Sequence, residues 1–129
     1  MTQVLLVEDN ALNRELVTDL LEVSGYQVFG VESAEEGLQW AFSQHPDVIL
    51  MDIALPGLDG LSALRQLKAN PVSWDIPVAM LSAHAMQDDE RAAWAAGCAV
   101  YLSKPINTRT FVATVAALHL PPAANGEAL

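Results

Sequence analysis

Short apolar segments rich in β-branched residues alternate along the chain with segments of helical periodicity. The apolar segments are nearly continuous, with few polar positions between the hydrophobic ones, which is the pattern of strands buried on both faces of a sheet. They predict strands at Val4–Val7, Val28–Val31, Val48–Met51, Pro77–Leu81 and Ala99–Leu102.

Helical periodicity follows each of these apolar segments. From Ala34 to Phe42, apolar residues recur at i, i+3, i+4, i+7 and i+8, and Ser33 with Glu36 forms a capping box in front of them. The other predicted helices lie at Leu16–Leu21, Leu61–Leu67, Asp88–Gly97 and Phe111–Leu118. This alternation predicts an α/β fold, a doubly wound, five-stranded parallel sheet with helices on both faces and right-handed crossovers.

The domain organisation is simple, because 129 residues without an internal repeat or a long linker correspond to one domain. Residues 1–120 contain all the predicted elements. Pro121–Leu129 is rich in Pro, Ala and Gly and is expected to be a flexible tail. The segment Asn70–Ile76 is a fairly long predicted loop before the fourth strand, and we expect Trp74 within it to pack against the core rather than form a contact surface.

Composition excludes several classes of function. The net charge is -10, from 16 acidic and 6 basic residues, and the basic residues are not clustered, so direct nucleic-acid binding is not expected. No apolar run is long enough to cross a bilayer, and the first residues lack the features of a secretory signal. Cys98 is the only cysteine, which excludes an intrachain disulfide and favours a cytoplasmic location.

Polar residues follow the predicted strands at the edge where open parallel sheets form their binding sites. Glu8 and Asp9 follow the first strand, Asp52 follows the third, Ser82 ends the fourth, and Lys104 follows the fifth. Each alone is an ordinary residue for the end of a strand, and Glu8 and Asp9 are equally suited to the first turn of a helix.

Together these residues suggest a specific chemistry. Three carboxylates in one crevice repel each other, and desolvation favours the protonated form of at least one of them. A Mg²⁺ ion would relieve this repulsion, because it prefers oxygen ligands and retains waters or phosphate oxygens. A lysine and a serine can contact phosphate oxygens, and a carboxylate can attack phosphorus to form an aspartyl phosphate. The set therefore has the parts needed to accept a phosphoryl group.

Four stretches carry a family resemblance that spans essentially the whole chain: VLLVEDN at 4–10, VILMDIALPGLDG at 48–60, VAMLSAHA at 78–85 and YLSKPI at 101–106. In their order and spacing they resemble the CheY-like receiver domain of bacterial response regulators. The resemblance implies a flavodoxin-like receiver fold with strand order 2-1-3-4-5 and five helices.

The resemblance also implies a role for each residue of the acidic cluster. Asp52 is the phosphoacceptor and, together with Asp9, a direct Mg²⁺ ligand. Glu8 is expected to bind the ion through water, and the backbone carbonyl of Ala54 is expected to be the third protein ligand.

Further roles follow from the same resemblance. Ser82 and Lys104 are expected to bond to phosphoryl oxygens, and Pro105 is expected to follow a cis peptide bond. Tyr101 matches the aromatic switch position, whose ring turns inward when Ser82 moves toward phosphate. A half-buried aromatic residue on an edge strand is a nearly equal alternative for Tyr101.

The expected function is a phosphorylation-dependent signalling switch of a two-component phosphorelay. A sensor histidine kinase or a histidine phosphotransfer protein would donate the phosphoryl group, and a downstream protein would read the switch, without nucleic acid or membrane as partner. The donor would dock on Asn10, Ala11 and Leu12 together with Pro105 and Ile106. No enzymatic activity is expected beyond the protein's own phosphorylation and dephosphorylation.

Three alternatives remain. The first is a receiver domain excised from a hybrid histidine kinase. The second is a Mg²⁺-dependent phosphohydrolase, which is disfavoured because such enzymes commonly carry a second acid two residues after the nucleophile, where this chain has Ala54. The third is an interaction module that no longer takes phosphate, which the intact set of acids, serine and lysine disfavours.

Overall fold

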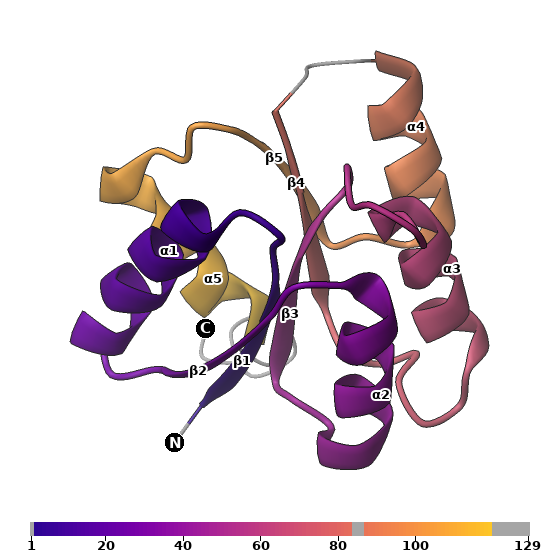
Figure 1. The fold of residues 1–129 in the computed structure, drawn as a ribbon, viewed down its shortest axis with the longest axis horizontal. Coiled ribbons are helices and arrows are strands. Elements are labelled where there is room, and N and C mark those ends of the chain that lie inside the picture. The colour runs from indigo at the N-terminus through magenta and orange to yellow at the C-terminus, as the bar shows by residue number, and fades with distance from the viewer. Residues whose placement is uncertain (1, 84–86, 120–129) are drawn as a thin grey trace, which may run out of the picture.

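The computed structural model describes residues 2–83 and 87–119, so the predicted tail at 121–129 lies outside the described residues. Within these ranges five strands and five helices alternate (Figure 1). Their bounds are β1 Gln3–Val7, α1 Ala11–Val23, β2 Gln27–Val31, α2 Ala34–Gln44, β3 Val48–Asp52, α3 Gly60–Ala69, β4 Val78–Ser82, α4 Gln87–Ala96, β5 Val100–Ser103 and α5 Thr108–His119. Every predicted element is present, with strand ends displaced by one residue at most.

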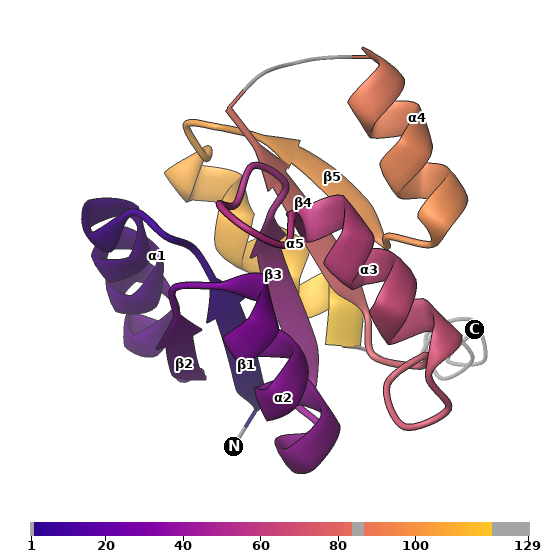
Figure 2. The same ribbon diagram turned by 45° about the vertical axis from the view of Figure 1, so that its right-hand side comes forward.

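The strands form one parallel sheet in the order β2-β1-β3-β4-β5, which confirms the predicted topology. Helices α1 and α5 cover one face of the sheet, and α2, α3 and α4 cover the other (Figures 1 and 2). Strand β2 is added on one side of β1, whereas β3, β4 and β5 are added on the other. The strand order therefore switches between β1 and β3, and a crevice is expected outside the carboxyl ends of these two strands. Among the helices of the described residues, none combines the length and the apolar character needed to cross a membrane.

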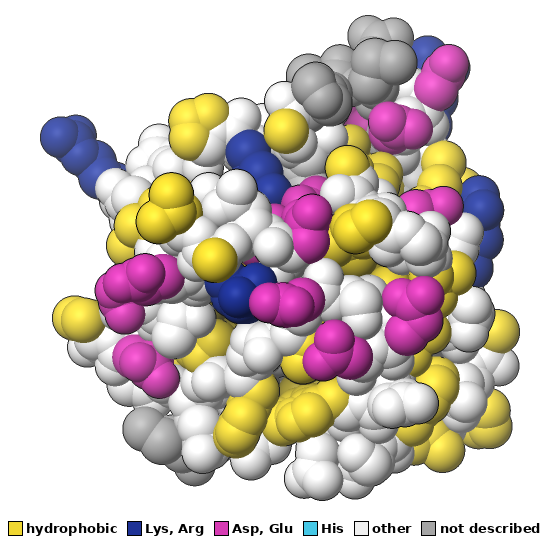
Figure 3. Space-filling view, in the orientation of Figure 1, with side chains coloured by type: hydrophobic (Ala, Val, Ile, Leu, Met, Phe, Trp, Pro, Cys, Tyr) yellow, Lys and Arg dark blue, Asp and Glu magenta, His cyan; other side chains and the backbone are white. Residues whose placement is uncertain are grey.

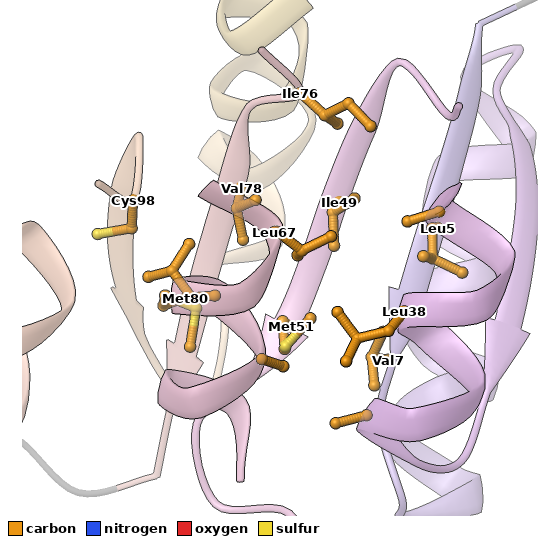
Figure 4. Packing of buried hydrophobic residues seen from close by; sticks show 14 of the residues in the cluster. Leu5, Val7, Leu38, Ile49, Met51, Leu67, Ile76, Val78, Met80 and Cys98 are labelled. Carbon is orange, nitrogen blue, oxygen red and sulfur yellow. The ribbon is translucent and has the colours of Figure 1, made fainter. Parts of the chain in front are cut away.

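The core has two halves because successive side chains of a strand point to opposite faces of the sheet. Leu5, Ile49 and Met80 lie under α2, α3 and α4, whereas Leu6 and Leu50 lie under α1 and α5. Figure 4 shows the first half, in which Leu38 and Leu67 of the helices point toward the strands. The central strands β1, β3 and β4 are therefore buried on both faces, which explains their continuous apolar sequence.

Helix caps keep the connections at the binding edge of the sheet short. Asn10 caps α1 by accepting a hydrogen bond from the backbone N–H of Asn13 at 3.0 Å. Ser33 caps α2 in the same way, as the capping box predicts, and Asp59 caps α3. Because α1 begins at the residue after Asn10, the turn between β1 and α1 consists of little more than the acidic pair Glu8–Asp9.

Two packing predictions were wrong. Leu16, expected within the buried stripe of α1, is 48% exposed, because only Val17 and Leu21 of that helix are fully buried. Trp74, expected to pack against the core, is 60% exposed. In its loop the buried residues are Ser73 and Ile76, and the Ser73 hydroxyl donates to the carbonyl of Leu67 at 2.7 Å.

Candidate functional site

The turn after β1 and the end of β3 bring three carboxylates together. Glu8, Asp9 and Asp52 each offer a carboxylate oxygen, and these oxygens lie within 4.8 Å of one another. Glu8 and Asp52 are buried, whereas Asp9 is exposed. On the face of the molecule seen in Figure 3, acidic side chains are scattered among hydrophobic and other residues. The cluster is thus made of oxygen donors alone and is open to solvent on the Asp9 side.

Lys104 bridges the two buried carboxylates. Its Nζ donates to Glu8 Oε1 at 2.6 Å and to Asp52 Oδ2 at 2.7 Å. Burial by itself lowers the pKa of Lys104, but the hydrogen bonds to Asp52 and Glu8 outweigh burial and the pKa is raised overall. This lysine is therefore held in its charged form between the carboxylates.

Burial also perturbs Glu8. Its pKa is raised above the ordinary value of 4.5, mainly by desolvation, although the hydrogen bond from Lys104 acts in the opposite direction. This direction agrees with the expectation that crowded, desolvated carboxylates favour protonation of one member. A cation at the cluster would lower this electrostatic cost, and oxygen donors suit a hard divalent ion.

The backbone around Asp52 leaves its carboxylate little freedom. Asp52 Oδ1 accepts a hydrogen bond from the backbone N–H of Ala54 at 3.1 Å, while Oδ2 accepts the bond from Lys104. The first residue of α3, Gly60, lies directly against this end of β3, because a Cβ atom there would be 2.1 Å from the backbone oxygen of Asp52. Sequence reasoning assigned no role to Gly60, since nothing in the sequence reveals a close approach of backbone to backbone.

Ser82 lies on β4, the strand next to β3, and Tyr101 lies on the edge strand β5 beyond it. Ser82 is buried at the end of β4, and its carbonyl accepts a hydrogen bond from the backbone N–H of Lys104 at 2.7 Å. Tyr101 pairs with Met80 across the sheet and is half-buried. Its hydroxyl is the one buried side-chain polar atom of the described residues without a hydrogen-bond partner.

The residues predicted to dock a donor surround the acidic cluster. Asn10, Ala11 and Leu12 are exposed at the start of α1, and Leu12 is 77% exposed. Pro105 and Ile106 lie on the connection between β5 and α5, where the Lys104–Pro105 peptide bond is cis. A pocket of about 350 Å³ separates this connection from α1 and has Glu8 and Lys104 in its wall. Of the predicted docking residues, Pro105 and Ile106 line this pocket, whereas its α1 side is formed by Asn13, Leu16 and Val17.

One basic residue near the cluster was missed. Arg14 of α1 donates from Nη1 to the backbone oxygen of Glu8 at 2.8 Å. Its only distinguishing signal in the sequence is that basic residues are few.

Fold and site together define a receiver-type signalling domain. The family model of the response regulator receiver domain matches residues 4–116, and the chain belongs to this family. It is thus a receiver domain of a two-component response regulator, as the resemblance of its motifs implies.

Several known response regulators are similar to this chain. The chain is 44% identical over 112 residues to the polar-differentiation response regulator DivK of Brucella ovis and of Brucella abortus, an alignment that covers 87% of this chain and 91% of each relative. A response regulator structure from Chloroflexus aurantiacus is 30% identical, with a TM-score of 0.86 and coverage of 91% of this chain and 96% of the other.

A second solved structure is informative about metal. The receiver domain of the sensor histidine kinase PA1611 from Pseudomonas aeruginosa is 34% identical, with a TM-score of 0.84 and coverage of 91% and 96%. That protein holds a magnesium ion in its active site cleft.

Proposed function

We propose that this receiver domain accepts a phosphoryl group on Asp52 from a phosphohistidine donor, with Mg²⁺ bound at the acidic cluster. The observation that carries the proposal is the meeting of three carboxylates within 4.8 Å, two of them bonded to the ammonium group of Lys104. This arrangement places a nucleophile, candidate metal ligands and a fixed positive charge at one point.

The residues present fit a magnesium ion. Asp9 and Asp52 would bind it directly, the backbone carbonyl of Ala54 would be the third protein ligand, and Glu8 would act through water. When bound, the ion supplies positive charge that screens the donor phosphate from the carboxylates. The magnesium in the PA1611 receiver domain supports this assignment.

The transfer itself requires one bond to form and one to break. An oxygen of the Asp52 carboxylate attacks phosphorus as the phosphorus–nitrogen bond of the phosphohistidine breaks, so an acyl phosphate forms and the imidazole leaves. Lys104 offsets the charge on the transferred oxygens, and the Ser82 hydroxyl donates a hydrogen bond to one of them. Movement of Ser82 toward the phosphoryl group and inward rotation of the Tyr101 ring would transmit the change to the face of β5.

The test of the acceptor is the intact mass of the protein after incubation with a small phosphodonor and Mg²⁺. The wild type should gain one labile phosphoryl group, and Asp52→Asn should gain none while remaining folded. Asp19→Asn is the matched control, because Asp19 is an exposed aspartate of α1 and should label like the wild type. Labelling of Asp52→Asn would show that the acceptor lies elsewhere, and turnover of the donor without retained label would favour a phosphohydrolase. Spontaneous decay of the label in isolated protein would measure the dephosphorylation that the domain is proposed to catalyse on itself.

The donor is proposed to be a sensor histidine kinase or a histidine phosphotransfer protein that docks over Asn10, Ala11, Leu12, Pro105 and Ile106. Leu12→Glu should slow transfer from a phosphohistidine protein at least tenfold, by about 1.4 kcal/mol or more, while labelling by a small donor stays unchanged. Val23→Glu is the control, because Val23 is 90% exposed at the far end of the same helix. Equal effects of the two substitutions would remove Leu12 from the docking surface.

The output is proposed to be a protein contact in the cytoplasm, and the free thiol of Cys98 supports a reducing compartment. A receiver domain within a hybrid kinase is the second candidate, favoured by the likeness to the receiver of PA1611. Both arrangements use the same chemistry at Asp52.

A further inference from the structure

Asp9 is proposed to bind the metal directly, but its carboxylate has no side-chain anchor among the residues that the structure describes. Among residues 2–83 and 87–119, no group donates a hydrogen bond to its carboxylate. Its neighbours are fixed, because the backbone N–H of Glu8 donates to Val31 at 3.0 Å and the N–H of Asn10 donates to Glu8 Oε2 at 3.2 Å. The position of the Asp9 carboxylate therefore depends on the peptide group that joins Glu8 to Asp9.

Arg14 holds that peptide group from outside the turn. Its Nη1 donates to the Glu8 carbonyl oxygen at 2.8 Å, and this carbonyl belongs to the peptide that leads into Asp9. Its Nη2 lies 3.4 Å from Glu32 Oε1 at the end of β2. The Arg14 side chain is 21% exposed and that of Glu32 is 70% exposed, so the pair with Glu32 contributes little stability. Its main effect is to orient the planar guanidinium group.

The edge strand β2 is shaped to receive this side chain. A Cβ atom at Gly30 would lie 3.0 Å from Cδ and 3.1 Å from Cγ of Arg14. The absence of a side chain at Gly30 thus lets the aliphatic part of Arg14 lie flat across β2, between α1 and the Glu8 carbonyl. Arg14 of α1 thus contacts both β2 and the turn that follows β1.

We propose that Arg14 is a positioning residue that fixes the Glu8–Asp9 peptide and so preorganises the Asp9 carboxylate for a divalent cation. The inference rests on the proposed function at Asp52 and adds to it the residue that aligns a metal ligand. Groups that orient metal ligands commonly change metal affinity by about 10-fold or more when removed.

The direction of the change in Mg²⁺ affinity distinguishes a positioning role of Arg14 from an effect of its charge. Arg14→Met removes a positive charge near the cluster, and by Coulomb's law alone this strengthens binding of a cation. Loss of the fixed Glu8–Asp9 peptide instead weakens binding of the cation. We expect the Mg²⁺ dissociation constant of Arg14→Met to rise about 10-fold despite the favourable change in charge.

The experiment measures Mg²⁺ binding to the full chain by titration of backbone amide resonances. Arg14→Lys keeps the charge but offers one ammonium in place of a planar fork, so its dissociation constant should lie between those of the wild type and Arg14→Met. Gly30→Val leaves Arg14 chemically intact but displaces its aliphatic part, and it should weaken Mg²⁺ binding in the same direction. Arg109→Met is the control for lost surface charge and should bind Mg²⁺ like the wild type.

Urea unfolding of each variant confirms that it is folded, and Gly30→Ala replaces Gly30→Val if the larger side chain prevents folding. An unchanged or tighter dissociation constant in Arg14→Met overturns the inference, as does an unaffected constant in the Gly30 variant. Labelling of Asp52 is measured separately and should be the same in Arg109→Met and wild type. Failure of the wild type to label would reject the proposed function. The Mg²⁺ dissociation constants would still test whether Arg14 positions the Asp9 carboxylate.

Discussion

Replacing Lys104 by Met tests the electrostatic arrangement of the site most directly. The substitution retains much of the side-chain volume but removes the ammonium group that bonds to Glu8 Oε1 and Asp52 Oδ2. The exposed fractions of these two carboxylate side chains are 2% and 6%, so water replaces the lost bonds poorly. Two buried negative charges then face each other without a cation.

The magnitude follows from this burial. Removing one partner of a buried ion pair costs about 3–5 kcal/mol. Because the Lys104 side chain is 17% exposed, we expect the lower end, a loss of about 3 kcal/mol in the free energy of unfolding without metal. Added Mg²⁺ should recover part of the loss, and should bind the variant more tightly than the wild type because a competing positive charge is gone.

The loss should depend on pH. Since the pKa of Glu8 is raised above 4.5 by burial, the folded protein holds this proton more tightly than the unfolded chain. The contribution of Glu8 to the free energy of unfolding therefore falls as pH rises from 4.5 through the folded-state pKa. Without the hydrogen bond from Lys104, the pKa of Glu8 in the folded protein rises further. The pH range over which stability falls therefore extends to higher pH. The deficit of Lys104→Met should be larger at about pH 8 than at about pH 5.

The assay is urea unfolding followed by tryptophan fluorescence, with a chelator, at both pH values. Arg65→Met is the matched control, because Arg65 is exposed on α3 and its loss changes net charge equally. A deficit below about 0.5 kcal/mol, the usual range of surface substitutions, would refute the reasoning. So would a deficit that shrinks with rising pH.

Two further predictions concern packing around the site. Gly60→Ala should cost at least about 1–3 kcal/mol in urea unfolding and slow the labelling of Asp52, because the new Cβ meets the Asp52 backbone. Gly25→Ala, where the Cβ meets open space at a φ of +94°, should cost about 1 kcal/mol and leave labelling unchanged; equal labelling rates in the two variants would contradict the contact. Burial raises the pKa of the Cys98 thiol, so iodoacetamide at about pH 8 should modify it far more slowly in native than in denatured protein. Similar rates in both states would mean that the thiol is accessible.

Much of the site was predictable because its residues follow parallel strands, which all end at the same edge of the sheet. A strand buried on both faces has a continuous apolar sequence, and in a parallel sheet all such strands end at the same edge. Glu8, Asp52 and Lys104 could therefore be brought together from their places after the strands. The structure adds that Lys104 bonds to both acids at once.

The features that could not be predicted from the sequence depend on contacts that follow no periodic pattern. An apolar stripe shows which positions of a helix can be buried, but α1 carries more apolar residues than the sheet covers, so Leu16 is exposed. Trp74 is exposed, whereas its polar neighbour Ser73 is buried and hydrogen-bonded. Arg14 and Gly60 act on backbone atoms distant in sequence, and such contacts leave no trace in residue spacing.

The uneven burial of the three carboxylates leaves Asp9 as the member of the cluster that is most exposed to solvent. Glu8 and Asp52 are buried, so an ion arriving from solvent on the Asp9 side meets the Asp9 carboxylate first. Asp9 is also the immediate neighbour of the surface on which the donor is proposed to sit. A donor bound there would cover Asp9, so we expect the ion to bind more readily before the donor than after it.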